Sequence, residues 1–168
     1  MCIRDSLAVL ELALASAPAA PTGSGRGRGL ALHASFGSIV AMVADVLVRD
    51  GAVRVEHITA AVDCGYAIHP DGVAAQIEGA TAFALSALFF GEITFAAGAA
   101  VPTNFHEQPL LRFDAMPRVD VHVVSRAVPP ERLGGVGEIG VPPVAPAVAN
   151  AVFAATGQRV RRLPLGPA

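Results

Sequence analysis

Apolar residues recur along the chain in blocks whose spacing changes from helical to strand-like. Near the amino end, Leu7, Leu10, Leu14 and Ala17 stand at helical spacing, which predicts an amphipathic helix. The next stretch, Pro18 to Gly29, is rich in proline and glycine and is therefore expected to form a loop.

Valine-rich segments follow this loop and predict a small sheet. A short strand is expected over 30–36, a longer one over 39–49 and another over 53–62. Asp50-Gly51, between the last two, is a preferred sequence for a two-residue hairpin turn. The close succession of these segments favours strands joined as a meander.

The middle of the chain is dominated by an apolar, alanine-rich segment over 73–90. Its length predicts a buried helix, and Gly91 is a suitable residue to end it. Gln76 and Glu78 interrupt the apolar run, which leaves it short of the ~20 apolar residues of a transmembrane helix. The segment is therefore expected to pack inside the domain and not to span a membrane.

Further strands are predicted after this helix. A short one is expected over 93–95, and residues 119–125 alternate as VDVHVVS. This alternation predicts a half-buried strand with Asp120, His122 and Val124 on one face.

The last part of the chain predicts a loop and a final helix. A loop is expected from Pro129 to Gly137, followed by a helix over 142–156 with Gly157 just beyond its end. The complete pattern predicts one α+β domain in which two or three helices pack on a small mixed or antiparallel sheet.

Composition narrows the function classes. The 168 residues suffice for one domain, and 53% hydrophobic with 15% charged residues is not a disordered composition. The net charge of −2, with no long run of one sign, argues against nucleic acid or an anionic membrane as partner. All twelve basic residues are arginines, which excludes chemistry that depends on lysine.

The first six residues, MCIRDS, resemble the translation of an adapter end used in DNA library preparation. Residues 1–6 are therefore set aside as an artefact, and 7–168 are assigned to the domain. The apolar run that follows also imitates a secretory signal, although Glu11 fits such a signal poorly. A genuine signal would make the chain a small exported binding or structural module, and this alternative stays open.

The segment GGVGEIGVPP, residues 134–143, carries the clearest candidate chemistry. Gly135, Gly137 and Gly140 form a literal G-x-G-x-x-G. However, a Pro-Pro loop precedes it where a strand is required, and no carboxylate follows ~20 residues later. A dinucleotide-binding site of the Rossmann type is therefore disfavoured.

A second interpretation of this segment is a glycine loop that approaches a bulky ligand. Glycine has no Cβ, so the loop can come close to a cofactor and offer N–H donors near a helix start. Glu138, expected in an apolar and partly buried setting, then suits a general base, with burial raising and the helix end lowering its pKa. From spacing alone, Glu138 could equally cap the following helix.

Other reactive residues give weaker signals. Cys64 lies in an apolar stretch and is interpreted as a buried free thiol. His106-Glu107 does not extend to HExxH, so no zinc site is inferred there, and no protein ligand to a metal is predicted. Arg26 and Arg28 are expected in a solvated loop, in preference to a phosphate-binding role.

Four segments, in this order, resemble successive blocks of one family: the large subunits of molybdenum hydroxylases of the xanthine dehydrogenase/aldehyde oxidase type, especially the isoquinoline 1-oxidoreductase beta-subunit branch. They are RGRGLALHASFGSIVAMVADV, AAVDCGYAIHPDGVAAQIEGA, TNFHEQPLLRFDAMPRVDVHVV and GGVGEIGVPPVAPAVANAVFAATGQRVRRLPL. The resemblance covers nearly everything after residue 6. It identifies the chain as the C-terminal part of a molybdopterin-binding domain, and hence as a fragment of a longer subunit.

The resemblance implies an oxidoreductase that hydroxylates a heteroaromatic or aldehyde carbon with water-derived oxygen. Glu138 matches the family's general base, which takes a proton from a molybdenum-bound hydroxide, and Gln76 matches a glutamine that hydrogen-bonds the pterin. The loop against the metal's ligands is matched by Gly134, Gly135, Val136 and Gly137. Ile139 stands where proline is common in the family, a departure that leaves the glutamate untouched.

The resemblance also implies cofactors and partners. Molybdopterin with molybdenum, in its cytosine dinucleotide form, is expected, with [2Fe-2S] clusters on a small partner subunit. The remainder of the large subunit would supply the substrate-gating residues for a small-molecule substrate. The isolated chain is therefore expected to be inactive and to bind no molybdenum, and its compartment, bacterial cytoplasm or periplasm, is left open.

Overall fold

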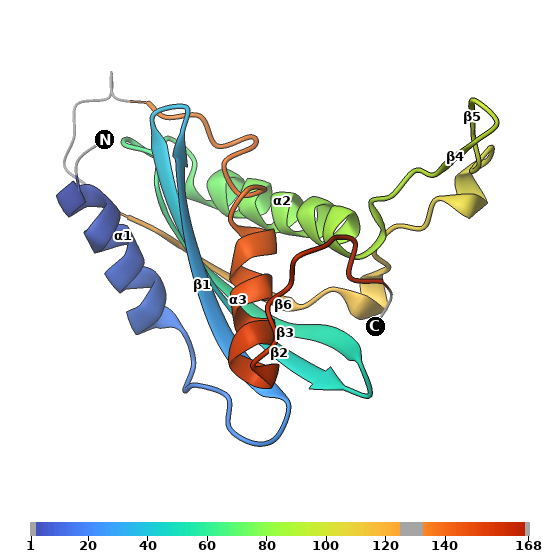
Figure 1. Cartoon of the computed structure of the whole chain (residues 1–168). Helices are drawn as coiled ribbons and strands as arrows, with labels where there is room; N and C mark the ends of the chain where they lie inside the picture. Colours follow the sequence, from blue (N-terminus) through green and yellow to red (C-terminus); the bar gives the residue numbers. More distant parts are fainter. Residues whose placement is uncertain (1–2, 125–132, 167–168) are drawn as a thin grey trace.

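The computed structural model describes residues 3–124 and 133–166. Helices pack on both faces of one four-stranded sheet whose strand order is β1-β2-β3-β6 (Figure 1). The strands of this sheet are β1 (Arg26–Ser35), β2 (Ser38–Arg49), β3 (Ala52–Asp63) and β6 (Arg118–Val123). The helices are α1 (Ile3–Ser16), α2 (Pro70–Phe90) and α3 (Val144–Thr156). The predicted α+β class, with three helices on a small mixed sheet, is confirmed.

The segment between α2 and β6 holds only short elements. They are β4 (Phe95–Ala96), β5 (Ala99–Ala100) and two 3-10 turns, η1 (Phe105–Glu107) and η2 (Phe113–Ala115). The strand predicted over 93–95 is thus reduced to two residues paired in a separate two-stranded hairpin.

Two tight hairpins join the first three strands. Asp50 and Gly51 connect β2 to β3 with φ of 52° and 83°, which confirms the two-residue turn predicted there, and positive φ at both positions is typical of type I′. Phe36 and Gly37 connect β1 to β2 with φ of 52° and 77°. The second turn was not predicted, because an aromatic residue rarely adopts a left-handed conformation.

The fourth strand makes the sheet mixed. β6 pairs parallel with β3, and Ile58 aligns with Val119. The strand predicted over 119–125 is confirmed for its first five residues, whereas Ser125 and the first four residues of the loop predicted from Pro129 lie outside the described residues. Val121 and Val123 face the α2 side and Val124 the α1 side, as the alternation predicted.

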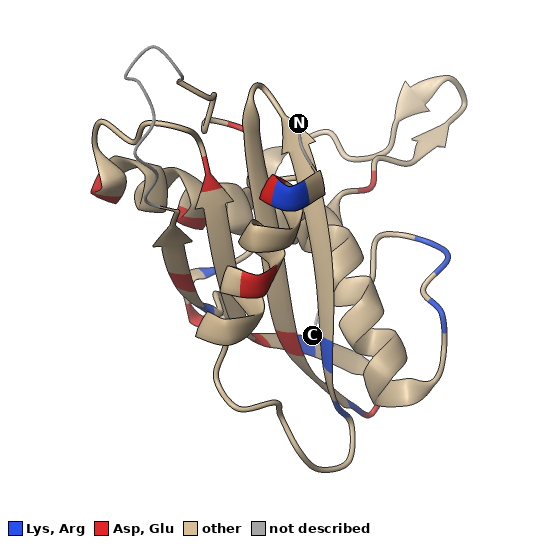
Figure 2. Ribbon diagram, turned by 90° about the vertical axis from the view of Figure 1, so that its left-hand side faces the viewer, with Lys and Arg blue, Asp and Glu red and all other residues tan. Residues whose placement is uncertain are grey.

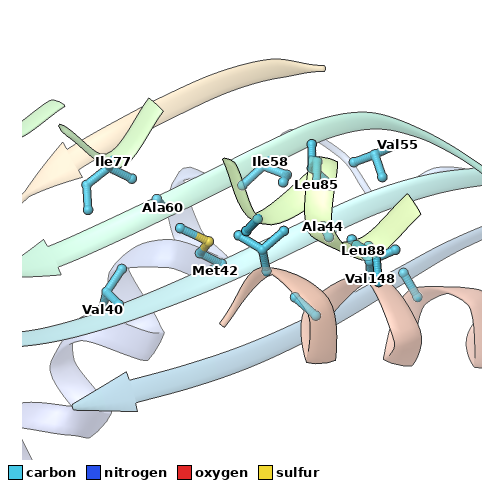
Figure 3. Packing of buried hydrophobic residues seen from close by; sticks show 14 of the residues in the cluster. Val40, Met42, Ala44, Val55, Ile58, Ala60, Ile77, Leu85, Leu88 and Val148 are labelled. Carbon is cyan, nitrogen blue, oxygen red and sulfur yellow. The ribbon is translucent and has the colours of Figure 1, made fainter. Parts of the chain in front are cut away.

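β2 is buried on both faces and forms the centre of two cores. Val40, Met42 and Ala44 pack toward α2 and α3, as Figure 3 shows. Ile39, Ala41 and Val43 pack toward α1 on the opposite face. This alternation follows the two-residue period of a strand and explains why residues 39–44 are all apolar.

A bulge in β3 keeps both halves of that strand in the larger core. The register shifts between Asp45 and Val46, because Asp45 aligns with His57 while Val46 aligns with Val55, leaving Glu56 as the extra residue. The bulge reverses the side-chain alternation, so that Val55 and Ile58 both face α2 and α3.

α2 lies across one face of the sheet. By length and composition it is the one helix of the described residues that could cross a membrane. Its apolar side is buried against the sheet, through Val73, Ile77, Leu85 and Leu88 among others, as expected for a core helix. Gly91 ends the helix, as predicted, and its N–H donates to the carbonyl of Ala87.

The backbone of α3 packs directly against the backbone of β1. The loop predicted from Pro18 to Gly29 is therefore wrong for its last four residues, which form the start of β1. The strand begins at Arg26, and a Cβ built on Gly29 would come within 2.2 Å of the Ala151 nitrogen and 2.3 Å of the Ala147 carbonyl oxygen. Glycine in this segment therefore permits close helix–strand packing, which its composition alone does not distinguish from a loop.

The environment predicted for Arg26 and Arg28, a solvated loop, is also wrong. Arg28 forms a bidentate pair with Asp45, with both N–O distances 2.7 Å, and Arg26 pairs with Glu56. They lie in a strand with cross-strand carboxylates, not in a solvated loop. Figure 2 shows charged segments scattered over the elements, with no broad stretch of one sign in that view.

α1 covers the second face of the sheet, but the side of the helix that faces the sheet differs from the predicted one. Val9 and Ala13 are buried, whereas Leu7 and Leu14 are exposed. The helix starts at Ile3 and rests on small residues of β2 and β3, so it turns its smaller side chains to the sheet. Leu10 and Ala17 are partly buried at the border of this contact.

The pair His57–Asp120 predicts a pH dependence of stability. The His57 ring, 2.8 Å from the carboxylate, and then Arg118 at 3.1 Å hold the pKa of Asp120 below its usual value. A depressed folded-state pKa contributes stability that is present above the unfolded pKa, near 4, and lost as pH falls through the folded value. In urea titrations between pH 7 and pH 2, we expect Asp120→Asn to flatten this acid-side loss, and an unchanged slope would contradict it.

Candidate active site

The glycine loop after β6 is attached to the sheet by consecutive backbone contacts. The Gly134 N–H donates to the Cys64 carbonyl oxygen and the Gly135 N–H to that of Phe36, each at 2.8 Å. Leu133 forms an isolated antiparallel bridge with Gly65. The loop therefore lies where the β1–β2 hairpin and the carboxyl end of β3 meet.

A second attachment fixes the other end of the loop. Ile139 is fully buried, and Gly140 packs on α2, because a Cβ built there would lie 2.9 Å from the Ala80 Cβ and 3.1 Å from the Ile77 Cδ1. The Glu138 carbonyl accepts from the Val141 N–H at 3.0 Å, which closes a turn just before α3. The backbone around Glu138 is thus held from both sides.

Glu138 itself is exposed, which corrects the partly buried setting expected from its neighbours. The apolar residue beside it, Ile139, takes the buried position, so the turn directs the two side chains to different environments. Among the described residues, no ion pair or hydrogen bond engages the Glu138 carboxylate. The capping alternative is also wrong, since α3 starts after Pro143 without a side-chain cap.

The loop can accommodate a bulky anionic group because some of its backbone N–H groups are free to donate to it. The N–H groups of Gly134 and Gly135 are already used within the sheet, so they cannot donate to a ligand in this arrangement. Those of Val136, Gly137 and Glu138 meet no acceptor within the described part of the chain. A Cβ built on Gly137 would meet nothing within 4 Å, so a ligand can approach the backbone there.

Gln76 lies on α2, the helix that Gly140 contacts. It is exposed and directly precedes Ile77, the buried residue that contacts Gly140. The glutamine is therefore one residue along the helix from a contact of the glycine loop. Its amide is available to a ligand that reaches from this loop toward α2.

Two further residues of this region were not found from the sequence. Phe36 is exposed on the hairpin tip, and its left-handed backbone turns its carbonyl toward Gly135. Ser38 is buried, and its Oγ has no hydrogen-bond partner among residues 3–124 and 133–166. The only sequence signal for either is Gly37, which marks a turn between the two strands predicted over 30–36 and 39–49.

Cys64 is buried and free, as predicted. Burial raises the pKa of its thiol, so that it stays protonated near neutral pH. Its contribution to the region is its carbonyl oxygen, which accepts from Gly134.

The contact between Gly134 and Ser38 predicts an energetic coupling. A Cβ at position 134 would come within 2.1 Å of the Ser38 Oγ and 3.1 Å of the Cys64 carbonyl oxygen. Gly134→Ala should therefore lower the free energy of unfolding by about 1–3 kcal/mol. Ser38→Ala removes an unpaired hydroxyl and should be neutral or stabilising. In a urea double-mutant cycle, we expect Ser38→Ala to recover part of the loss, whereas strict additivity would contradict the contact.

Comparison with known proteins gives a consistent family. Residues 17–117 match the family described as molybdopterin cofactor-binding domain. Isoquinoline 1-oxidoreductase subunit beta of Brevundimonas diminuta is 34% identical over 131 residues, which cover 77% of this chain and 16% of that protein. A membrane-bound aldehyde dehydrogenase [pyrroloquinoline-quinone] of Gluconacetobacter polyoxogenes is 36% identical over 118 residues, 70% of this chain and 15% of that protein.

A solved structure shares the fold. Quinoline 2-oxidoreductase from Pseudomonas putida 86 superposes with a TM-score of 0.69 and 25% identity, over 77% of this chain and 18% of that one. This chain thus spans less than one fifth of the length of each of these three proteins.

Proposed function

Because the chain belongs to the molybdopterin cofactor-binding domain family of molybdenum-dependent oxidoreductases, we propose that it is part of a large subunit and carries the catalytic base of a hydroxylase. The reaction adds water-derived oxygen to an electron-poor carbon of a heteroaromatic compound or an aldehyde. The relatives named for isoquinoline and quinoline support a heteroaromatic substrate. The observation that carries the proposal is the free Glu138 carboxylate on a loop attached at both ends.

Glu138 acts as the general base in this proposal. Its carboxylate accepts the proton of the water-derived hydroxyl group as that oxygen bonds to the substrate carbon. A carboxylate without a competing ion pair is available for this transfer, and the anchored backbone limits its movement. When bound, the molybdenum cofactor supplies the redox chemistry that removes two electrons from the substrate.

The loop and α2 together would hold the pterin. The Gln76 amide is proposed to hydrogen-bond the pterin, and the free N–H groups of Val136 and Gly137 to face the polar groups around the metal. Gly134 and Gly135 contribute by attaching the loop, since their own N–H groups are engaged. The form of the cofactor is proposed to be the cytosine dinucleotide.

The proposal includes partners beyond this chain. A small subunit with [2Fe-2S] clusters would receive the electrons, and the remaining part of the large subunit would complete the substrate pocket. One relative is named as a beta subunit, which supports a partner subunit in general, and it spans far more than the matched residues, which supports a longer large subunit.

A chimeric enzyme tests the proposal. In it, this chain replaces the matching segment of the Brevundimonas diminuta subunit, which is co-produced with its partner subunit. We expect the purified chimeric enzyme to retain molybdenum, measured by inductively coupled plasma mass spectrometry, and to oxidise isoquinoline. The isolated 168-residue chain is the control and should bind no molybdenum. A folded chimeric enzyme without molybdenum would contradict the proposal.

Pyrroloquinoline quinone is the alternative cofactor, because one relative is named for it. The family match over residues 17–117 favours molybdopterin instead. Extraction of the chimeric enzyme separates the two cofactors, since the quinone is an organic molecule without metal. Its recovery in a one-to-one ratio, with no molybdenum, would support the alternative.

A further inference from the structure

A long connection between α2 and β6 projects from the domain as an arm. We use "the arm" for residues 92–115, which hold β4, β5, η1 and η2. Figure 1 shows β4, β5 and η1 extending beyond the end of α2, and the chain returning to the domain at η2, just before β6. The arm lies within the range that matches the family, so it is part of the domain.

The arm exposes aromatic rings that the domain does not cover. Phe105 is 95% exposed and Phe113 97%, each on its own 3-10 turn. Phe95 and Leu110 are also largely exposed. A single exposed apolar residue is ordinary, but several large ones along one connection, from its outer end to its base, are typical of an interaction surface.

Local hydrogen bonds order the arm without burying these rings. Around η1, the Asn104 side chain accepts from the Phe105 N–H at 2.8 Å, and the Glu107 carboxylate accepts from the Thr103 and Asn104 N–H groups at 2.6 and 3.1 Å. This capping box fixes the turn that carries Phe105.

Two longer contacts hold the base of the arm. The Gln108 side-chain amide donates to the Glu92 carbonyl at 3.2 Å, joining the outgoing and returning segments. The Leu111 N–H donates to the Ser86 Oγ on α2 at 3.1 Å. A surface ordered before binding loses less conformational entropy when it docks, which favours a specific partner.

The position of the arm selects the partner. Ile77 and Ala80, near the middle of α2, contact the glycine loop, whereas the arm follows the last residue of the same helix. About 15 Å of helix separates Ala80 from that last residue, so the arm begins outside the contact between α2 and the loop. The matched residues are 16% of the Brevundimonas diminuta subunit, so most of such a polypeptide lies outside this chain and can supply an apolar surface for the arm.

We propose that the arm is the docking element through which this domain binds an apolar surface of the remainder of the large subunit, with Phe105 and Phe113 as its anchors. The occupant rests on the proposed function, and the relatives agree with it because the matched segment is 16% of the Brevundimonas diminuta subunit. Aromatic anchors on a projecting element commonly dominate the energy of such contacts.

Photo-cross-linking tests the arm in the chimeric enzyme. Phe105→p-benzoylphenylalanine places a reactive group at the proposed anchor, and the same substitution at Phe83, 69% exposed on α2, is the matched control. We expect irradiation to join position 105 to the same polypeptide outside this chain, mapped by mass spectrometry. Cross-links to the small subunit or to a second copy, or an equal yield from position 83, would overturn the proposal.

A comparison of Tm values tests the arm separately from folding of the domain and from the proposed function. Phe105→Ser with Phe113→Ser should leave the Tm of the isolated chain unchanged, because neither ring is buried, and lower the Tm of the chimeric enzyme. A loss in the isolated chain, or no loss in the chimeric enzyme, overturns the docking role. Molybdenum content is recorded separately. If the arm cross-links as expected but the enzyme holds no molybdenum, only the proposed function is contradicted. If the enzyme holds molybdenum but the expected cross-link is missing, only the role of the arm is contradicted.

Discussion

Glu138→Gln should lower kcat of the chimeric enzyme by about 10²–10⁴-fold, the range expected when a general base is removed. The amide keeps the size of the side chain but cannot accept the proton. Because Glu138 is exposed and lies outside the buried core, the Tm and the molybdenum content should stay unchanged. Steady-state oxidation of isoquinoline, with metal content measured on the same sample, gives the comparison.

Glu78→Gln is the matched control, since it makes the same chemical change at another exposed glutamate, on α2. It should leave kcat unchanged. If Glu138→Gln retained full activity at normal molybdenum content, the base would have to be another group. A fall in molybdenum content with Glu138→Gln would instead assign the residue to cofactor retention.

Gly29→Ala should cause the largest loss of stability among simple glycine substitutions in this chain, about 3 kcal/mol of the free energy of unfolding. The new methyl group would meet backbone atoms of α3, at 2.2 Å from the Ala151 nitrogen and 2.3 Å from the Ala147 oxygen. Backbone atoms cannot rotate away, so the helix has to move off the strand. Urea unfolding of the isolated chain, followed by circular dichroism, measures the effect.

Gly79→Ala is the matched control for this substitution. Position 79 lies inside α2, and a Cβ built there would meet nothing within 4 Å. The change should therefore stabilise the chain by about 0.5–1 kcal/mol through helix propensity alone. If both variants lost stability equally, the contact between β1 and α3 would not be the cause.

Much of the fold could be predicted because the periodicity of the strands and helices is strong. The Asp50-Gly51 hairpin, the long helix ended by Gly91 and the last helix ended by Gly157 all follow from local residue preferences. The parallel pairing of β6 with β3 could not be predicted in this way, because it joins segments far apart in the chain.

The errors lie where a tertiary contact overrides a local preference. The RGRG sequence is typical of a loop, yet Gly27 and Gly29 serve the close packing of α3, and Arg28 pairs with Asp45 across the strands. Likewise, Leu7 and Leu14 of α1 are exposed, whereas the smaller Val9 and Ala13 are buried against the sheet.

The candidate site was predicted from family resemblance far more than from local physics. Spacing alone left Glu138 between a base and a helix cap, and the structure removes the cap. Ser38 and Phe36 were missed because their importance depends on how the hairpin tip meets the loop, which no local pattern records. The catalytic role of Glu138 and the cofactor contacts of Gln76 stay predictions.

The parallel β3–β6 pair also sets an order of assembly. β1, β2 and β3 are joined by two-residue turns, so they can form a meander within microseconds from contacts close in sequence. β6 can join only after the chain closes a loop that contains α2 and the arm, which costs more entropy and takes longer. Until then the outer edge of β3 has free N–H and C=O groups that could pair with another chain, and only the later pairing of β6 covers this edge.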